Sequence, residues 1–302
     1  MPLKHSHFLP IALALAGVFL FSVMDAVMKA QALAMGTFSA MFWRNAMGAL
    51  FAATLYLPFR PKKPSEAAFK LHVGRSALTA VMMYLFFFGL TRIPLAQAIG
   101  LTFIAPIIAL FLAAPFLGER IGPNVKLAAL LGFGGVMVVV GGDLLSINAN
   151  TDLLGVSAIV AFSVMYAINL ILQRKLALIA KPKEITFYQN TFVLLLMIPF
   201  APLLLLMPAN ELQWGGAILA GLVAIGSLIL MSIAYRRAEA QQLITTEYTA
   251  FIWAALFGWW IFDETVSPQT LVGTGLIMLG CIVSARKATP RFGHTPTEEP
   301  SP

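Results

Sequence analysis

The chain has few of the residues on which metal and redox chemistry depend. Among its 302 residues there is one cysteine, Cys281, in an apolar stretch, which excludes an internal disulfide or a cysteine-based metal cluster. The four histidines are His5, His7, His72 and His294; they lie near the termini or at the edge of an apolar segment and form no zinc or haem pattern. We expect no metal site and no cofactor.

Charge is also scarce. Only 11% of the residues are charged and 59% are hydrophobic, with a mean hydropathy of +0.85. Soluble domains carry roughly 25% charged residues, so water cannot solvate this surface on all sides. Apolar runs such as Leu9–Met28 approach the ~20 residues that a spanning helix needs. The sequence therefore predicts an all-α integral membrane protein in contact with lipid, and its net charge of +7 is assigned to loops rather than to nucleic-acid binding.

Several sequence patterns of other functional classes are missing. There is no G-x-x-x-x-G-K-[ST] segment, which argues against ATP as the direct energy source. There is also no H-E-x-x-H or G-x-S-x-G segment, so we expect no enzyme. A channel needs filter-like loops or a ring of charges, and the sequence offers neither.

Ten apolar segments are predicted to span the membrane. Loops rich in Pro, Gly, Asn and charge separate most of them. They cover residues 9–31, 37–58, 72–91, 95–117, 125–144, 153–174, 184–207, 213–235, 240–262 and 268–286.

The basic residues support this count. Because cytoplasmic loops are enriched in Lys and Arg, ten spans with both termini in the cytoplasm place seventeen of the twenty basic residues on one side. Lys29 and Arg92 fall on the other side, and Arg44 lies within a span. The seventeen are Lys4, Arg60, Lys62, Lys63, Lys70, Arg75, Arg120, Lys126, Arg174, Lys175, Lys181, Lys183, Arg236, Arg237, Arg286, Lys287 and Arg291.

The chain also repeats itself. "FSVMDA" at Phe21–Ala26 returns as "FSVMYA" at Phe162–Ala167, and "FWRN" at Phe42–Asn45 returns as "FYQN" at Phe187–Asn190. From Phe42 onward the offset is a constant 145 residues, and it also matches Arg, Gln, Glu and Pro residues between the halves. We expect residues 9–145 and 153–286 to be two five-helix repeats. They are flanked by a cytoplasmic N-terminus at 1–8 and a disordered tail at 287–302.

An odd number of spans in each copy inverts the second copy in the membrane. Inverted repeats are a recurrent architecture of secondary transporters, whose substrate site lies near the midplane between the halves. Lys4 followed by an apolar run imitates a signal peptide, but the run is too long and has a counterpart in mid-chain. It is predicted to be a retained first span.

Ten spans in two halves, with "LGERI" at Leu117–Ile121 and "FDETV" at Phe262–Val266, resemble the EamA family of the drug/metabolite transporter superfamily. The stretch "MDAVMK…FWRN" is similar to members that take up S-adenosylmethionine or riboflavin. The resemblance implies a bacterial inner-membrane carrier of small molecules, and a homodimer is left open. We expect secondary active transport of an amino acid-like or amphipathic metabolite, coupled to protons or to exchange. A vitamin or nucleoside-like cargo is the alternative, and a channel is the least favoured one.

Ionisable residues inside spans are costly and are functional candidates by default. Three qualify: Asp25, Arg44 and Glu247. Arg44 is predicted to hold a substrate carboxylate or phosphate, while Asp25 and Glu247 are candidates for proton coupling. Two structural alternatives compete, an ion pair of Asp25 with Lys29 one turn away and an ion pair of Asp25 with Arg44.

Polar and aromatic side chains at similar depth complete the predicted substrate site, with packing or interfacial anchoring as the alternative for each. They are Trp43, Tyr84, Gln97, Tyr166, Asn169, Tyr188, Gln189, Tyr235, Tyr248 and Trp253. Glu119 and Glu264 are predicted to be turn and helix-cap residues. Glycines crowd the fifth and tenth spans, where they predict close helix packing.

Overall fold

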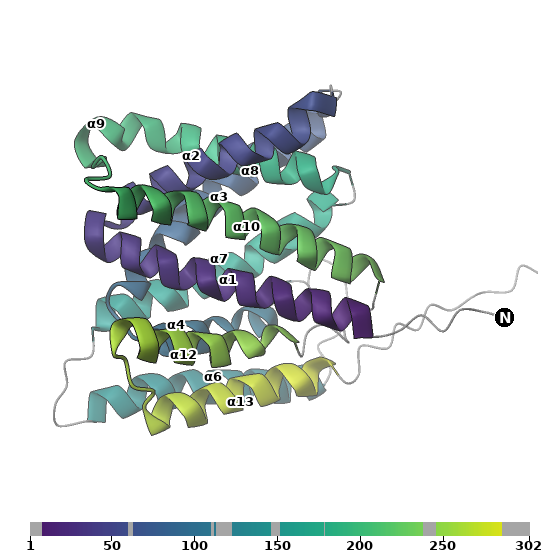
Figure 1. Cartoon of the computed structure of the whole chain (residues 1–302). Coiled ribbons are helices and arrows are strands. Elements are labelled where there is room, and N and C mark those ends of the chain that lie inside the picture. The colour runs from purple at the N-terminus through teal and green to yellow at the C-terminus, as the bar shows by residue number, and fades with distance from the viewer. Residues whose placement is uncertain are drawn as a thin grey trace, which may run out of the picture.

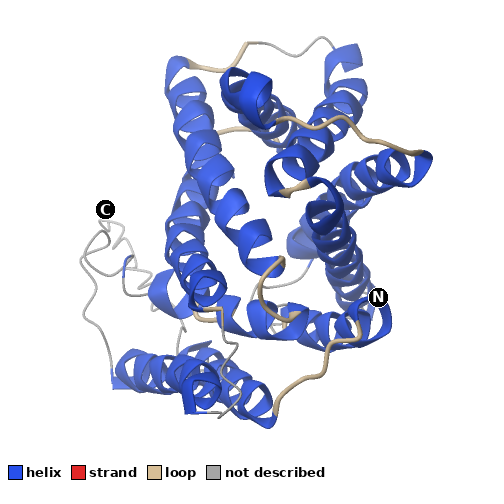
Figure 2. Ribbon diagram, turned by 90° about the vertical axis from the view of Figure 1, so that its left-hand side faces the viewer, coloured by secondary structure: helices blue, strands red, loops and turns tan. Residues whose placement is uncertain are grey.

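The computed structural model describes residues 8–59, 63–109, 112, 123–145, 152–177, 179–237 and 246–285. Within these residues every regular element is a helix (Figures 1 and 2). The predictions for residues 1–7, for Glu119 and for the tail from 286 onward lie outside the described part. The elements are α1 (Phe8–Met35), α2 (Thr37–Tyr56), η1 (Leu57–Phe59), α3 (Glu66–Leu90), α4 (Leu95–Thr102), α6 (Pro123–Leu145), α7 (Leu153–Ala177), α8 (Pro182–Met197), η2 (Ile198–Phe200), α9 (Ala201–Leu204), α10 (Glu211–Arg237), α12 (Thr249–Phe262) and α13 (Pro268–Ala285).

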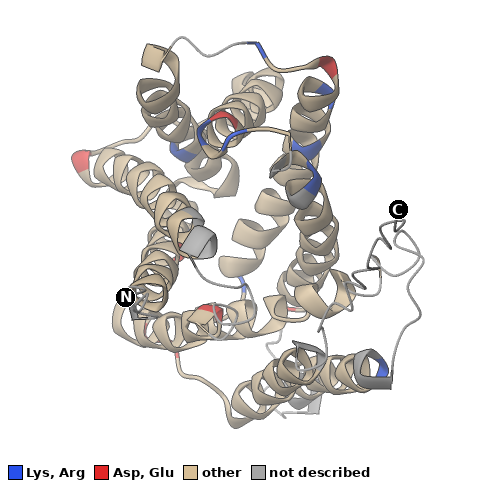
Figure 3. Ribbon diagram, turned by 90° about the vertical axis from the view of Figure 1, so that its right-hand side faces the viewer, with Lys and Arg blue, Asp and Glu red and all other residues tan. Residues whose placement is uncertain are grey.

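The length and composition of the helices fit a membrane protein. Five segments among the described residues are long and apolar enough to cross a bilayer, and four shorter helices are also apolar. The five are Leu9–Met35, Glu66–Leu90, Leu153–Gln173, Pro182–Leu204 and Glu211–Met231. Large apolar side chains such as Leu130, Phe133 and Trp260 are more than half exposed. Charged residues lie mostly near helix ends (Figure 3). The chain is therefore a multi-pass integral membrane protein.

The helices lie in successive tiers that run across the molecule, and α1 begins on the same side on which α13 ends (Figure 1). The most extensive pairings are α6 with α13, α1 with α10, α3 with α7 and α2 with α8. The repeat matches α1, α2 and α3 to α7, α8 and α10. The first helix of each half therefore packs on the third helix of the other half, as α1 does on α10 and α7 on α3. The second helix of each half likewise contacts the third helix of the other half, as α2 does with α10 and α8 with α3.

Glycines bring α6 and α13 into close contact. A Cβ atom on Gly135 would lie 2.5 Å from the carbonyl oxygen of Gly273, and one on Gly273 would lie 2.6 Å from that of Gly135. A Cβ atom on Gly280 would approach the Ala128 carbonyl oxygen within 2.8 Å. The predicted packing role thus holds at these positions, between two helices of one chain. Gly134 and Gly275 face open space instead.

A sharp turn joins the first two helices. Gly36 adopts a φ of +81°, a conformation that glycine reaches without steric cost, and α2 starts at the next residue. At 1.5 Å per residue, Asp25 on α1 and Arg44 on α2 lie roughly 16 Å and 12 Å from this turn. The two residues therefore lie at similar depth, as the sequence predicts.

α3 begins six residues earlier than the predicted span, at Glu66 instead of residue 72. The Ser65 hydroxyl accepts a hydrogen bond from the Ala68 N–H at 3.2 Å and caps the helix. His72 and Arg75, which stand at the start of the predicted span, therefore lie well inside the helix. His72 is 1% exposed and Arg75 is 5% exposed.

Two helices are interrupted at positions related by the 145-residue offset, which the sequence analysis did not anticipate. α4 ends at Thr102, Phe103 and Ile104 form a turn, and helix resumes at Ala105. The second interruption is at Tyr248, just before α12. Pro106 explains the first one, because it has no N–H to bond the Thr102 carbonyl.

The two interruptions meet inside the protein. The rings of Phe103 and Tyr248 pack edge to face, with centroids 5.4 Å apart. The Cys281 thiol donates a hydrogen bond to the Phe103 carbonyl oxygen at 3.2 Å. Carbonyl groups released from helical pairing need other partners at this depth. The lone cysteine therefore satisfies a backbone group at the junction of the halves.

Candidate functional site

Asp25 and Arg44 lie close enough to interact electrostatically, but the described residues include no ion pair between them. The Arg44 guanidinium instead donates to thioether sulfurs, from Nη2 to Met24 at 3.4 Å and from Nη1 to Met83 at 3.7 Å. Its Nε is buried and has no hydrogen-bond partner. Thioethers are weak acceptors, so the donors of Arg44 are not saturated. The structural ion-pair alternative for Asp25 and Arg44 is therefore not realised.

Tyr166 links Asp25 to the second half of the chain. It lies on α7 at the position that the repeat matches to Asp25, and its ring stacks on Phe162 with an interplanar angle of 10°. It interacts electrostatically with Glu247, Arg75 and Asp25. Tyr166 is thus within electrostatic range of Asp25 and Glu247, and Arg44 is connected to it through Asp25. We refer to Asp25, Arg44, Tyr166 and Glu247 as the central cluster.

Glu247 directly precedes the interruption at Tyr248 and lies within electrostatic range of Tyr248 and Cys281. Its side chain is half-buried, as are those of Asp25, Arg44 and Tyr166. Partial accessibility inside a membrane protein is expected of groups that line an internal aqueous space. The cluster therefore joins an interrupted helix to charged groups from the other half.

Lys29 has a partner other than Asp25. It forms a buried ion pair with Glu264, and its ammonium also donates to the Ile93 carbonyl oxygen at 2.9 Å. The second carboxylate oxygen of Glu264 accepts the Leu95 N–H at 2.7 Å. Glu264 is thus a helix-cap residue, as predicted, but it caps α4. The alternative pairing of Asp25 with Lys29 is wrong, because Lys29 holds α1, α4 and the end of α12 together.

Arg92 is paired as well. Its Nη1 lies 2.5 Å from Oδ2 of Asp152, whose Oδ1 accepts the Gly155 N–H at 3.0 Å and caps α7. The hydrogen bond from Arg92, followed by that from Gly155, lowers the pKa of the Asp152 carboxyl. Both basic residues assigned to the less basic side of the membrane therefore have carboxylate partners.

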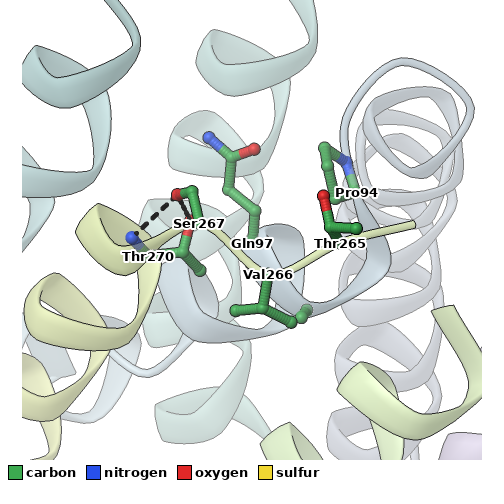
Figure 4. A pocket seen from close by; sticks show the side chains of 7 residues that line it. Pro94, Gln97, Thr265, Val266, Ser267 and Thr270 are labelled. Carbon is green, nitrogen blue, oxygen red and sulfur yellow. Dashed lines mark hydrogen bonds between the residues drawn. The ribbon is translucent and has the colours of Figure 1, made fainter. Parts of the chain in front are cut away.

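A small cavity lies beside the start of α4, where the Gln97 side chain lies between Ser267 and Thr270 on one side and Pro94 and Thr265 on the other (Figure 4). The Ser267 hydroxyl closes one side through a hydrogen bond with Thr270. At about 70 Å³ the cavity has room for a few waters and not for a metabolite. Gln97 therefore belongs to this pocket. The lining residues are Pro94, Ala96, Gln97, Thr265, Val266, Ser267 and Thr270.

The predicted aromatic residues divide into two groups. Tyr248 is buried beside Glu247. Tyr84 is 42% exposed, stacks on Phe88 and shares an outward apolar face of α3 with Val81, so it faces lipid.

Trp43 and Trp253 are half-buried and pack against the hydrophobic core. The Trp43 N–H donates to the Leu206 carbonyl oxygen at 3.0 Å, and its ring meets that of Trp214. Trp253 packs edge to face on Phe19 with centroids 4.9 Å apart. Gln189 is half-buried on α8. The structure therefore brings together Asp25, Arg44, Tyr166, Glu247 and Tyr248, whereas the contacts described for Trp43, Tyr84, Gln97 and Trp253 are with other residues.

Sequence reasoning named Asn169 and Tyr188 but missed the polar residues toward the start of α3 that contact them. His72 Nε2 lies 3.2 Å from Oε1 of Glu184 on α8, and the His72 ring packs 4.8 Å from that of Tyr188. Arg75 donates to two amide oxygens of α7, from Nε to Asn169 at 3.0 Å and from Nη2 to Gln173 at 3.3 Å. A signal was available, because positions 72, 75, 76 and 79 are polar at the spacing of one helix face.

The fold and the central cluster together define a class: a helical membrane carrier with ionisable groups beside interrupted helices. A family model identifies it further. The EamA-like transporter family matches residues 8–141 and again residues 153–286, and the chain belongs to this family. No group of three metal-ligating side chains occurs among the residues that the structure describes.

Individual relatives are transporters by name. The chain is 27% identical to the pseudopaline exporter CntI of Pseudomonas aeruginosa, covering 91% of this chain and 95% of the relative. It is 27% identical to a riboflavin transporter of Rhizobium johnstonii, covering 88% and 87%. It is 28% identical to an S-adenosylmethionine uptake transporter of Rickettsia felis, covering 73% and 74%. A solved crystal structure shares the fold with a TM-score of 0.63 at 18% identity, covering 91% and 96% of the two chains.

Proposed function

We propose that this member of the drug/metabolite transporter superfamily is a secondary active carrier in a bacterial inner membrane. It moves a small metabolite that bears both an anionic and a cationic group, by alternating access coupled to protons or to exchange. The observation that carries the proposal is the central cluster, in which Asp25 and Arg44 of the first half reach Glu247 of the second half through Tyr166.

The architecture we propose has ten spans in two inverted five-helix repeats, at 9–145 and 153–286, with both termini in the cytoplasm. The family model matches the chain twice over nearly these ranges. Helix pairings recur between the halves, and the two interruptions are 145 residues apart. Two inverted copies that exchange conformations would open a central site first to one side and then to the other.

Each charged group has a chemical role in this proposal. Arg44 has a planar fork of donors and only thioether partners, so it can bind a substrate carboxylate or phosphate. Asp25, at similar depth, can bind a substrate ammonium or a proton. Glu247 lies at a helix interruption, where a small change of backbone alters its surroundings, and it is the proposed proton-coupling residue.

The alternative cargo is a vitamin or nucleoside-like molecule. Relatives named for riboflavin and for S-adenosylmethionine favour it, whereas the relative named for pseudopaline export indicates that members of the family also release metabolites. A carrier runs in the direction that the gradients dictate, so the proposal covers either direction.

Metabolite profiling tests the proposal. Cells and medium are compared by mass spectrometry for wild type, Glu247→Gln and empty cells, at equal protein level. A metabolite that changes between cells and medium only with the wild type supports the carrier and the role of Glu247. Identical wild-type and Glu247→Gln profiles that differ from empty cells would remove Glu247 from the site. Transport would be contradicted if wild type, Glu247→Gln and empty cells gave the same metabolite profile both in rich medium and in whole-cell extract.

A further inference from the structure

Arg75 is a buried cation that the proposed function does not use. It lies two turns inside α3 and is 5% exposed. Its guanidinium donates hydrogen bonds to the amide oxygens of Asn169 and Gln173, both of which are neutral. A guanidinium inside a spanning helix is costly unless an anion neutralises it. Hydrogen bonds are supplied here, but within the described residues no carboxylate pairs with the positive charge.

The acid nearest to this region already has a partner. Glu184 pairs with His72, one turn before Arg75 on α3. Arg75 is instead within electrostatic range of His72 and of the Tyr166 phenol. None of the ion pairs among the described residues includes Arg75. The environment of Arg75 is therefore neutral to positive, which favours the arrival of an external anion.

Arg44 also donates hydrogen bonds to neutral groups, but it lies at a different depth along α3. Its guanidinium contacts Met83, which is eight residues after Arg75 on α3. At 1.5 Å per residue, the two levels are roughly 12 Å apart along the helix axis. Tyr166 interacts electrostatically with Arg75 and with Asp25, the residue coupled to Arg44. Arg75 and Arg44 thus both have neutral hydrogen-bond partners, and they lie at two different depths inside the protein.

We propose that Arg75 is a second anion-binding residue of the transport path. The transported molecule then carries a carboxylate or phosphate group that Arg75 and Arg44 bind at the two levels. This inference rests on the proposed function, and it specifies the anionic part of the cargo. Asn169 and Gln173 orient the Arg75 fork by holding Nε and Nη2, so the rest of the guanidinium can meet the cargo.

Substitutions at Arg75 and Asn169 separate this role from a structural one. Arg75→Gln removes the charge. Asn169→Asp keeps Arg75 but places a carboxylate of nearly the same shape where Arg75 Nε already donates. If Arg75 only supported the fold, the new ion pair would preserve both stability and transport. If Arg75 binds an anionic cargo, the new carboxylate competes with the cargo for the same donors. Lys70→Gln is the matched control, because Lys70 is an exposed cation on the same helix.

The test uses the full-length protein in liposomes loaded with soluble bacterial metabolite extract, and mass spectrometry of the released compounds. We expect wild type and Lys70→Gln to release the same compounds, each with a carboxylate or phosphate. We expect Arg75→Gln and Asn169→Asp to release them about ten- to hundredfold more slowly, the range of a lost charge-assisted hydrogen bond.

Three other results would count against the inference. Release of only neutral or cationic compounds by the wild type would overturn it, and so would wild-type rates in Asn169→Asp. An equal loss of release rate in Lys70→Gln would also overturn it, because the effect would then follow from the overall positive charge and not from Arg75. If wild-type liposomes release nothing beyond empty liposomes, the proposed function itself fails, which distinguishes that failure from a failure of Arg75 alone.

Discussion

The two halves of the chain share a helical pattern but differ in interior charge. The first half places Asp25, Arg44 and Arg75 inside its helices, and the repeat matches them to Tyr166, Gln189 and Ala220. Ala220 is fully buried, so a small apolar side chain packs well at a position where the first half holds a guanidinium. A helix of this kind therefore does not need the charge in order to pack. The proposed function assigns the charges of the first half to the cargo.

Glu247 reverses this trend, because its counterpart in the first half is Thr102. Both residues directly precede an interruption of the helix, at Phe103 and at Tyr248. The hydroxyl of Thr102 donates to the Ile99 carbonyl oxygen of its own helix at 2.7 Å. The carboxylate at the second interruption can instead exchange a proton. The same kind of helix interruption thus follows a structural side chain, Thr102, in one half and a candidate proton-coupling residue, Glu247, in the other.

Glu247→Gln should have the largest effect, since it makes the second interruption as uncharged as the first. We expect transport driven by an imposed pH gradient to fall to the level of empty vesicles, while exchange of substrate across the membrane continues. The measurement is flux in proteoliposomes with and without the gradient, and Glu211→Gln on the exposed start of α10 is the control. Gradient-driven flux at the wild-type rate would remove Glu247 from coupling.

Glu264→Gln should have the next largest effect, because it leaves the Lys29 ammonium buried without its carboxylate. Breaking a buried ion pair by removing one partner costs about 3–5 kcal/mol. We expect the free energy of unfolding in detergent to fall by this amount. The double variant with Lys29→Met should recover part of the loss.

Asp263→Asn is the matched control for Glu264→Gln. Asp263 adjoins Glu264, is exposed and has a φ of 53°, which asparagine tolerates. An equal loss of stability in Asp263→Asn would show that the linker geometry, and not the ion pair, is what matters.

Arg44→Lys should have an intermediate effect. The substitution keeps the charge of the first half but removes the planar fork that binds two carboxylate oxygens at once. We expect transport to slow about tenfold, with a smaller change than in Arg44→Gln. Initial rates in proteoliposomes at equal protein amount provide the measurement. Wild-type rates in both variants would show that Arg44 does not contact the cargo.

Asp152→Asn should have the smallest effect and should appear as a change in pH dependence. Arg92 and the Gly155 N–H lower the pKa of Asp152 in the folded protein below its ordinary value of 3.8. A lowered pKa stabilises the fold above that ordinary value, and this contribution is lost as the pH falls through the folded pKa. We expect wild-type stability to decline slightly more than that of Asp152→Asn below about pH 4. The measurement is the unfolding midpoint of both proteins across pH 3–7. If the contact between Arg92 and Asp152 were unimportant, the two curves of midpoint against pH would be parallel.

The positions of the helices could be predicted because apolar length and loop composition act locally. Spans placed at 153–174 and 268–286 lie within three residues of α7 and α13. The start of α3 was placed late, because its first turns mix polar and apolar residues. Pro106 offered a signal for the interruption at Phe103. Nothing in the sequence around Tyr248 indicates the second interruption, where Tyr248 contacts Phe103 and Cys281.

The candidate site was harder to predict than the helices. Asp25, Arg44 and Glu247 stood out because charge is costly in lipid, and electrostatic contacts do connect them through Tyr166. Aromatic residues carry no such signal, because a tyrosine suits a substrate site or a lipid-facing surface equally well. Tyr84 and Tyr166 illustrate this, since the first lies on an outward face and the second lies in the central cluster.

These two tyrosines also provide the most direct test of the account, which holds that the central cluster lines an aqueous path through the membrane. Each is changed to cysteine, as Tyr166→Cys and Tyr84→Cys, in a Cys281→Ala background that has no other thiol. The rate of labelling by a charged, membrane-impermeant thiol reagent is then measured in sealed vesicles. The account predicts labelling of Tyr166→Cys and almost none of Tyr84→Cys, which faces lipid. A Tyr166→Cys protein that stays unlabelled from both sides of the membrane would contradict it.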